Sequence, residues 1–89
     1  MCRNIRTLFN FEPPATEEEM RAAALQYVRK VSGSTHPSKA NQAAFDRAVE
    51  RIMRETRSLI AELVTTSPPR DREIEREKAL ARARQRYGN

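Results

Sequence analysis

The sequence predicts an all-α fold: an antiparallel helical hairpin with a docked N-terminal arm and a third, basic C-terminal helix. Two apolar stripes at helical spacing, separated by a short connector, indicate the hairpin. Glycine is scarce, with two in 89 residues, and alanine, glutamate, arginine and leucine are frequent, which favours helix. No segment alternates apolar and polar residues strongly enough to predict a strand.

The first predicted helix begins after Thr16, whose hydroxyl can cap a helix N-terminus. Glu19 completes a capping box three residues later. One apolar stripe follows at three- and four-residue steps: Met20, Ala23, Ala24, Tyr27, Val28 and Val31. Gly33 is the expected C-terminal residue. Leu25 lies off the stripe, so we expect a second surface to cover it, and it is the residue we expect at any dimer interface.

A longer second helix is predicted from Lys39 to Thr65, because nothing inside that range breaks the helical pattern. Ser38 is its expected cap. Its stripe comprises Ala44, Phe45, Ala48, Val49, Ile52, Met53, Leu59, Ile60, Leu63 and Val64. Thr56 interrupts this stripe, and we expect its hydroxyl to bond back to the carbonyl oxygen of Ile52.

The Ser-Pro-Pro segment 67–69 is predicted to end the second helix and to open a third, with Ser67 as its cap. Composition predicts that this helix runs over residues 70–87, with an anchored start near Ile74. Its apolar residues are divided between two faces, so we expect it to dock weakly. Two ion pairs at i,i+3 spacing would support it: Glu73–Arg76 and Glu75–Lys78.

The N-terminal arm is expected to be extended and to fill the apolar groove along the hairpin. It carries four large apolar residues within seven positions: Ile5, Leu8, Phe9 and Phe11. We expect Phe9 and Phe11 to be mostly buried against Val28 or Phe45. The arm does not read as a secretory leader, because it has no continuous apolar run.

The chain is expected to form a single domain, with the arm at 1–15, the hairpin at 16–66 and the basic helix at 67–89. Its apolar content of 38% is low, so we expect marginal stability unless it oligomerises. A single cysteine cannot form an internal disulfide, and no apolar run reaches membrane-spanning length. These features predict a cytoplasmic protein without membrane contact.

The net charge of +5 is concentrated at the two ends. Residues 1–11 carry two arginines and no acid, whereas residues 12–69 carry eight basic and eight acidic side chains and are neutral. Residues 70–89 carry seven basic and four acidic side chains. Basic ends suit partners that carry phosphate, although they also serve simply to keep a small protein soluble.

Three arginines, Arg47, Arg51 and Arg54, follow one another at helical steps on the outer face of the second helix. They form either a short ladder for phosphates or an ordinary solvated face, and Glu50 is expected to pair with Arg54. The candidate phosphate or nucleic-acid contacts are Arg3, Arg6, Arg47, Arg51, Arg54, Arg82, Arg84 and Arg86. Any affinity for nucleic acid is expected to be weak and sequence-independent.

Cys2 and His36, the only cysteine and the only histidine, are the candidate catalytic residues. Arg3, Arg6 and a free α-amino group would lower the pKa of the Cys2 thiol, and His36 could act as its base. The alternatives are a structural thiol and a solvated imidazole. A zinc site would need two more ligands than cysteine and histidine supply, so we expect neither metal nor cofactor.

Five stretches resemble a known family: Cys-Arg-Asn-Ile-Arg-Thr-Leu at 2–8, Asn-Phe-Glu-Pro-Pro-Ala-Thr at 10–16, and residues 23–33, 44–49 and 63–73. That family is domain of unknown function 2277, which comprises small bacterial proteins. The resemblance covers about residues 2–80. It implies a bacterial protein and a real domain, but no activity, ligand or partner.

The leading interpretation is a small non-enzymatic interaction module that binds a partner protein or a second copy of itself. The alternative is a small thiol enzyme or redox sensor that acts through Cys2 with His36. The sequence leaves open whether the chain is an enzyme, what it binds and whether it oligomerises. The distance between these two side chains, and a pocket beside them, would discriminate between the interpretations.

Overall fold

The computed structural model describes residues 5–87 of the chain and is mostly helical over this range, as the sequence predicts. In chain order the elements are β1 (Phe11–Glu12), α1 (Glu17–Ser32), the 3₁₀ turn η1 (Lys39–Asn41), α2 (Gln42–Glu62), β2 (Arg70–Asp71) and α3 (Arg72–Tyr87). β1 and β2 form a small parallel sheet that the sequence does not predict. Two-residue strands are too short to produce a recognisable alternation.

Helix α1 forms as predicted, because both of its ends are satisfied by local contacts. The hydroxyl of Thr16 accepts the backbone N–H of Glu19 at 3.1 Å, and the Glu19 carboxylate accepts the backbone N–H of Thr16 at 2.9 Å. At the other end Gly33 adopts a left-handed conformation, with φ of 70°, and its N–H donates to the carbonyl of Arg29. Glycine suits this position because it has no Cβ to strain.

Helix α2 is shorter than predicted at both ends. Its expected first turn is the 3₁₀ turn η1, in which Ser38 accepts a backbone hydrogen bond but makes no side-chain cap. The helix ends at Glu62, three residues early, and the chain continues extended toward the prolines. Inside the helix, the Thr56 hydroxyl donates to the carbonyl of Ile52 at 2.7 Å, as predicted.

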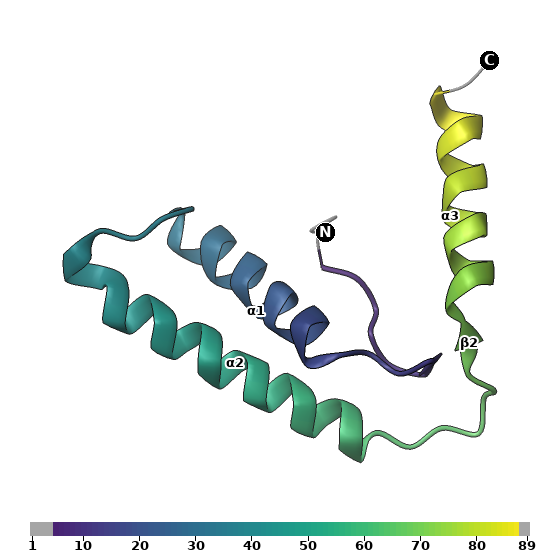
Figure 1. Ribbon diagram of the computed structural model, residues 1–89, viewed down its shortest axis with the longest axis horizontal. Helices are drawn as coiled ribbons and strands as arrows, with labels where there is room; N and C mark the ends of the chain where they lie inside the picture. Colours follow the sequence, from purple (N-terminus) through teal and green to yellow (C-terminus); the bar gives the residue numbers. More distant parts are fainter. Residues whose placement is uncertain (1–4, 88–89) are drawn as a thin grey trace.

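α1 and α2 lie side by side around a small apolar core (Figure 1). Five of its side chains are buried: Met20, Ala24, Val28, Val49 and Met53. Two ion pairs tie the helices together, Glu17 with Arg57 and Arg21 with Glu50 at 2.8 Å. The start of α1 therefore faces the end of α2. Glu50 pairs across the helices with Arg21 rather than along its own helix with Arg54, because packing brings the Arg21 guanidinium to it.

The core is enlarged by side chains that are only partly buried against it: Leu8, Ala15, Leu25, Phe45, Ala48, Ile52 and Ile60. Leu25 is therefore covered in part from within the chain, although it lies off the predicted stripe. Leu8 is the residue through which the arm reaches the core.

The expectation that Phe9 and Phe11 are mostly buried against the hairpin is wrong. Both are only partly buried, and neither packs on the core. Phe11 lies in β1 opposite Arg70, and the guanidinium carbons of Arg70 and Arg72 each lie 5.7 Å from its ring centroid. Cations over an aromatic face are attracted to it, so Phe11 packs against arginines rather than against apolar side chains.

The Ser-Pro-Pro segment 67–69 leads into β2 and does not cap a helix. The third helix begins two residues later than predicted, at Arg72, and the carboxylate of Asp71 accepts the backbone N–H of Ile74 at 3.1 Å. Contacts with the arm hold this segment extended. The carbonyl of Asn10 accepts the backbone N–H of Arg70 at 2.8 Å, and the Asn10 side-chain amide donates to the carbonyl of Pro68.

Helix α3 projects away from the hairpin (Figure 1). Ile74 and Leu80 are about half exposed on it, which agrees with the weak docking that its polar sequence predicts. The expected pair Glu75–Lys78 forms at 3.5 Å. Among the described residues no helix is both long and apolar enough to cross a membrane.

Candidate functional site

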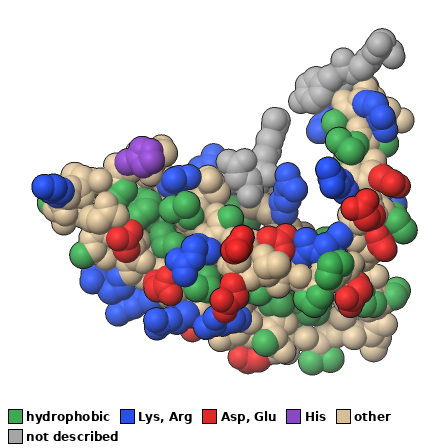
Figure 2. Space-filling view, viewed as in Figure 1, with side chains coloured by type: hydrophobic (Ala, Val, Ile, Leu, Met, Phe, Trp, Pro, Cys, Tyr) green, Lys and Arg blue, Asp and Glu red, His purple; other side chains and the backbone are tan. Residues whose placement is uncertain are grey.

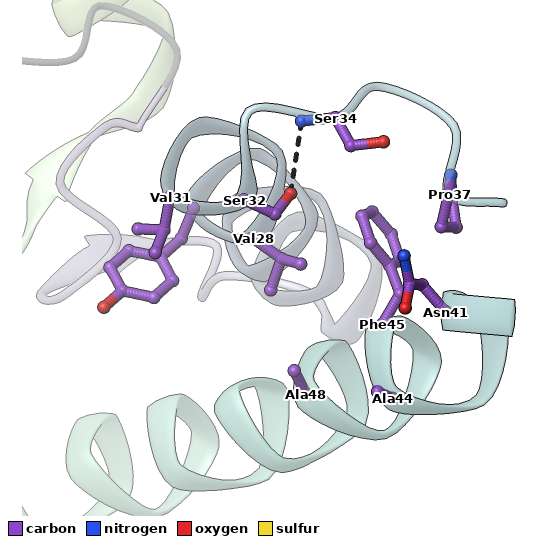
Figure 3. Close-up of a pocket in the computed structure, with 10 residues that line it drawn as sticks. Val28, Val31, Ser32, Ser34, Pro37, Asn41, Ala44, Phe45 and Ala48 are labelled. Carbon is purple, nitrogen blue, oxygen red and sulfur yellow. Dashed lines mark hydrogen bonds between the residues drawn. The ribbon is translucent and has the colours of Figure 1, made fainter.

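A pocket of about 380 Å³ opens at the connector end of the hairpin, between the last turns of α1 and the first turns of α2 (Figure 3). Val28 points from α1 toward α2, and Phe45 points from α2 toward the connector. The lining is Tyr27, Val28, Val31, Ser32, Ser34, Pro37, Asn41, Ala44, Phe45 and Ala48. Tyr27 is 49% and Val31 is 69% exposed, so much of this apolar wall meets water. The volume falls in the range of ligand pockets.

A second hollow, of about 440 Å³, lies farther along α2. It is lined by Arg51, Ile52, Glu55, Thr56 and Leu59. Leu59 is 56% exposed, although it belongs to the apolar stripe of α2.

The two hollows follow one another along the same side of α2. The first hollow is lined by residue 41 of η1 and by residues 44, 45 and 48 of α2, and the second by residues 51, 52, 55, 56 and 59 of α2, at steps of three and four. We call this row the hairpin groove. From Asn41 to Leu59 it measures about 27 Å along the helix. None of the arm residues lines it, so the expected filling by the arm is not found among the described residues.

Charges of both signs border the hairpin groove. Arg51 and Glu55 belong to its lining and lie one helical turn apart. Within the part of the chain that the structure describes, neither forms an ion pair. On the face drawn in Figure 2, apolar side chains are exposed between basic and acidic ones. The groove is therefore an apolar strip with a cation and an anion at its edge.

The predicted catalytic pair is not assembled by the described residues. Cys2 lies outside them, as does Arg3. His36 is exposed in the connector, and its backbone carbonyl accepts a hydrogen bond from the Ser34 hydroxyl at 3.0 Å. Its imidazole makes no hydrogen bond or ion pair with the described residues and does not line the nearby pocket. Over residues 5–87 no group of three or more histidine, cysteine, aspartate or glutamate residues is arranged to hold a metal ion.

The predicted phosphate contacts lie on three separate parts of the molecule. Arg6 is exposed on the arm, and Arg47, Arg51 and Arg54 are exposed on α2. The basic residues of the last turns, Arg82, Arg84 and Arg86, are exposed on α3. Arg21 lowers the pKa of Glu50 by hydrogen bonding to it, and the nearby charges of Arg54 and Arg57 add to that effect. The basic face of α2 is thus partly neutralised.

Arg72 is an important residue that the sequence pattern does not single out. Its two terminal nitrogens donate to the two carboxylate oxygens of Glu19, at 2.9 and 2.8 Å, and its Nε donates to the carbonyl of Pro13 at 2.6 Å. The hydrogen bonds from the Arg72 terminal nitrogens, with that from the backbone N–H of Thr16, lower the pKa of Glu19 to about 2. The carboxylate in turn raises the pKa of Arg72. This junction joins the arm, α1 and α3.

Comparison with known proteins identifies one family. A family model described as "Uncharacterized conserved protein (DUF2277)" matches residues 1–78, which include the entire hairpin groove and end within α3. No curated protein and no solved structure matches the chain. Because the family match covers most of the 89 residues and confirms the resemblance seen in the sequence, this chain belongs to the DUF2277 family.

Proposed function

We propose that this protein is a small non-enzymatic interaction module whose hairpin groove binds the apolar face of an α-helix, from a partner protein or from a second copy. The supporting observation is the accessible surface, 7436 Å² for a chain of 10.3 kDa. A compact monomer of this mass exposes about 5,400 Å². The radius of gyration, 15.9 Å, also exceeds the value of about 12 Å expected for a compact domain of this length.

The surplus surface belongs to the chain as a whole, and α3, which projects away from the hairpin, contributes to it. It amounts to roughly 2,000 Å². Part of it is apolar, because Tyr27, Val31 and Leu59 border the groove and are 49%, 69% and 56% exposed. Burying each large apolar side chain fully would contribute about 1.5–3 kcal/mol. An open apolar strip of this kind favours a binding role.

The dimensions of the groove suit a helix as ligand. Its length of about 27 Å corresponds to five turns of α-helix. Amphipathic helices bind such grooves through apolar residues at steps of three and four. In this proposal the chain is one domain: the antiparallel hairpin (16–66) provides the groove, while the docked arm (1–15) and the C-terminal segment (67–89) stabilise one end and leave the groove free.

The test is selection of helical peptides from a displayed library of randomised amphipathic sequences on the immobilised protein. Leu59→Glu places a charge in the groove, and because Leu59 is half exposed the fold should tolerate the change. Val64→Glu is the matched control, since Val64 is 92% exposed and lies outside the groove. We expect helical peptides that bind the parent and the control but bind Leu59→Glu at least tenfold more weakly, as expected for a charge placed in an apolar contact.

The proposal fails if the groove accepts no helix from any source. That result would be a library without enriched helical peptides, together with a molecular mass that stays at one chain at every concentration. Circular dichroism of both variants verifies that they remain folded.

A further inference from the structure

Building on the proposed function, we infer that the occupant of the hairpin groove is the groove of a second copy of this chain. Two hairpins would pack groove to groove about a two-fold axis and form a four-helix bundle. Two-fold dimers are the commonest assemblies of identical chains, and pairs of helices with one uncovered apolar side commonly complete a core in this way.

The charges at the groove edge are self-complementary. Arg51 and Glu55 are one turn apart on the same side of α2 and have opposite signs. A two-fold axis perpendicular to α2 reverses the second helix. At the level of Met53 it sets Arg51 against Glu55 of the second copy, and Glu55 against Arg51 of the second copy. One symmetry operation therefore pairs two cations with two anions, whereas a parallel arrangement would oppose like charges.

The sizes of the side chains that this axis would bring together also agree with it. Leu59 and Ala48 lie at almost equal heights on either side of Met53 along the helix. The axis that pairs the charges therefore also brings each Leu59 opposite Ala48 of the other copy. A large half-exposed side chain meets a small one that lines the neighbouring hollow, which is the way side chains interlock between helices. The contact forms twice by symmetry.

The surface area also favours a second copy. A groove-to-groove dimer would cover the exposed apolar side chains that border the groove, Tyr27, Val31 and Leu59. Among the described residues the core has five buried side chains, so it gains more from such an interface than a larger core would.

Segments of the same chain are poor candidates for the occupant. The bonds from Arg72 to Glu19 and Pro13 fix the start of α3 at the first turn of α1, and α3 then projects away from the hairpin (Figure 1). The groove lining within the described residues comes from α1, the connector, η1 and α2 alone.

Charge reversal tests the axis directly. In Arg51→Glu, the new acid would face Glu55 of the second copy, and in Glu55→Arg the new base would face Arg51. Each variant alone should dimerise about tenfold or more weakly than the parent. In an equimolar mixture, a chain with two acids meets a chain with two bases, so dimerisation should return. The double exchange Arg51→Glu with Glu55→Arg should also dimerise. Arg54→Glu, an exposed change outside the groove lining, is the control.

The measurement is the molecular mass by light scattering and sedimentation over a concentration series. The inference holds if the parent, the control, the mixture and the double exchange have the mass of two chains while the single variants dissociate. A parent that stays at one chain but binds selected helical peptides overturns the self-association and retains the proposed function. A two-chain parent that neither charge reversal nor Leu59→Glu weakens places the interface elsewhere and overturns the inference, while the peptide selection alone then decides the proposed function.

Discussion

Arg72 binds Glu19 through both terminal nitrogens of its guanidinium, at 2.9 and 2.8 Å. The pair joins the first residue of α3 to the first turn of α1, across 53 positions of sequence. The same carboxylate also completes the capping box with Thr16. One side chain therefore stabilises a helix start and the attachment of a distant segment, which makes it a sensitive point for stability.

Arg72→Ala is expected to lower the free energy of unfolding, because it removes the hydrogen bonds to Glu19 and Pro13. The paired charges are bidentate, but their side chains are 31% and 36% exposed, so solvent screening keeps the effect well below that of a buried pair. Arg72→Lys should recover only part of the loss, because an ammonium group cannot bind both carboxylate oxygens in parallel. Urea denaturation measures the effect, with the exposed Arg76→Ala as control. Equal losses for Arg72 and Arg76 would contradict the structural role of this pair.

The stability of the protein is expected to fall in acid through Glu19. Its pKa is about 2 in the folded chain, against an ordinary value of 4.5, so folding favours the ionised form. The resulting stabilisation is fully present above about pH 4.5 and is lost as the pH falls toward 2. Glu19→Gln removes this titration. The difference in unfolding free energy between parent and variant should therefore shrink across this window, and a constant difference would refute the assignment.

Leu8 is expected to contribute more to stability than Phe9, although Phe9 is larger. Leu8 packs on the core, whereas Phe9 is partly buried away from it. Leu8→Ala should lower the unfolding free energy by about 1–2 kcal/mol, less than for a fully buried leucine. Thermal melting of Leu8→Ala, Phe9→Ala and the parent measures the order. A larger loss for Phe9→Ala would show that the arm docks through a different residue.

The exposed arginines of α2 predict weak binding to nucleic acid that falls steeply with salt. Replacing Arg47 and Arg54 by glutamine should reduce any such binding, since phosphate contacts are additive and sequence-independent. Both residues lie outside the groove lining, so dimerisation should be unaffected. Fluorescence titration with duplex and single-stranded DNA at low and physiological salt measures the affinity. An absence of binding at low salt would remove this partner class.

The thiol of Cys2 is expected to react faster at neutral pH than an ordinary cysteine, whose pKa is about 8.5. The neighbouring Arg3 and Arg6 in sequence favour the thiolate. If His36 acts as its base, His36→Ala should shift the pH profile of labelling upward. Iodoacetamide labelling against pH measures both effects. An ordinary midpoint that the substitution leaves unchanged would end the catalytic hypothesis.

Contacts between near neighbours along the chain could be predicted from the sequence, because helical geometry alone brings the partners together. The Thr16–Glu19 capping box, the left-handed Gly33 and the Thr56–Ile52 hydrogen bond all join residues within four positions or depend on one residue's backbone. The apolar stripe that lines the groove also follows from helical periodicity. For these features the spacing of residue types is sufficient information.

Contacts between distant segments were decided only by the tertiary structure. Glu50 has basic neighbours on its own helix, yet it pairs with Arg21 because the packing of α1 on α2 brings that side chain closer. Phe11 could have joined the core, but the β1–β2 pairing places it against Arg70 and Arg72 instead. These pairings depend on which loops close and which surfaces come into contact. The spacing of residues along one helix carries no information about either. For the same reason, the sequence predicts an apolar stripe, whereas only the fold shows that the described residues of the arm do not line the hairpin groove.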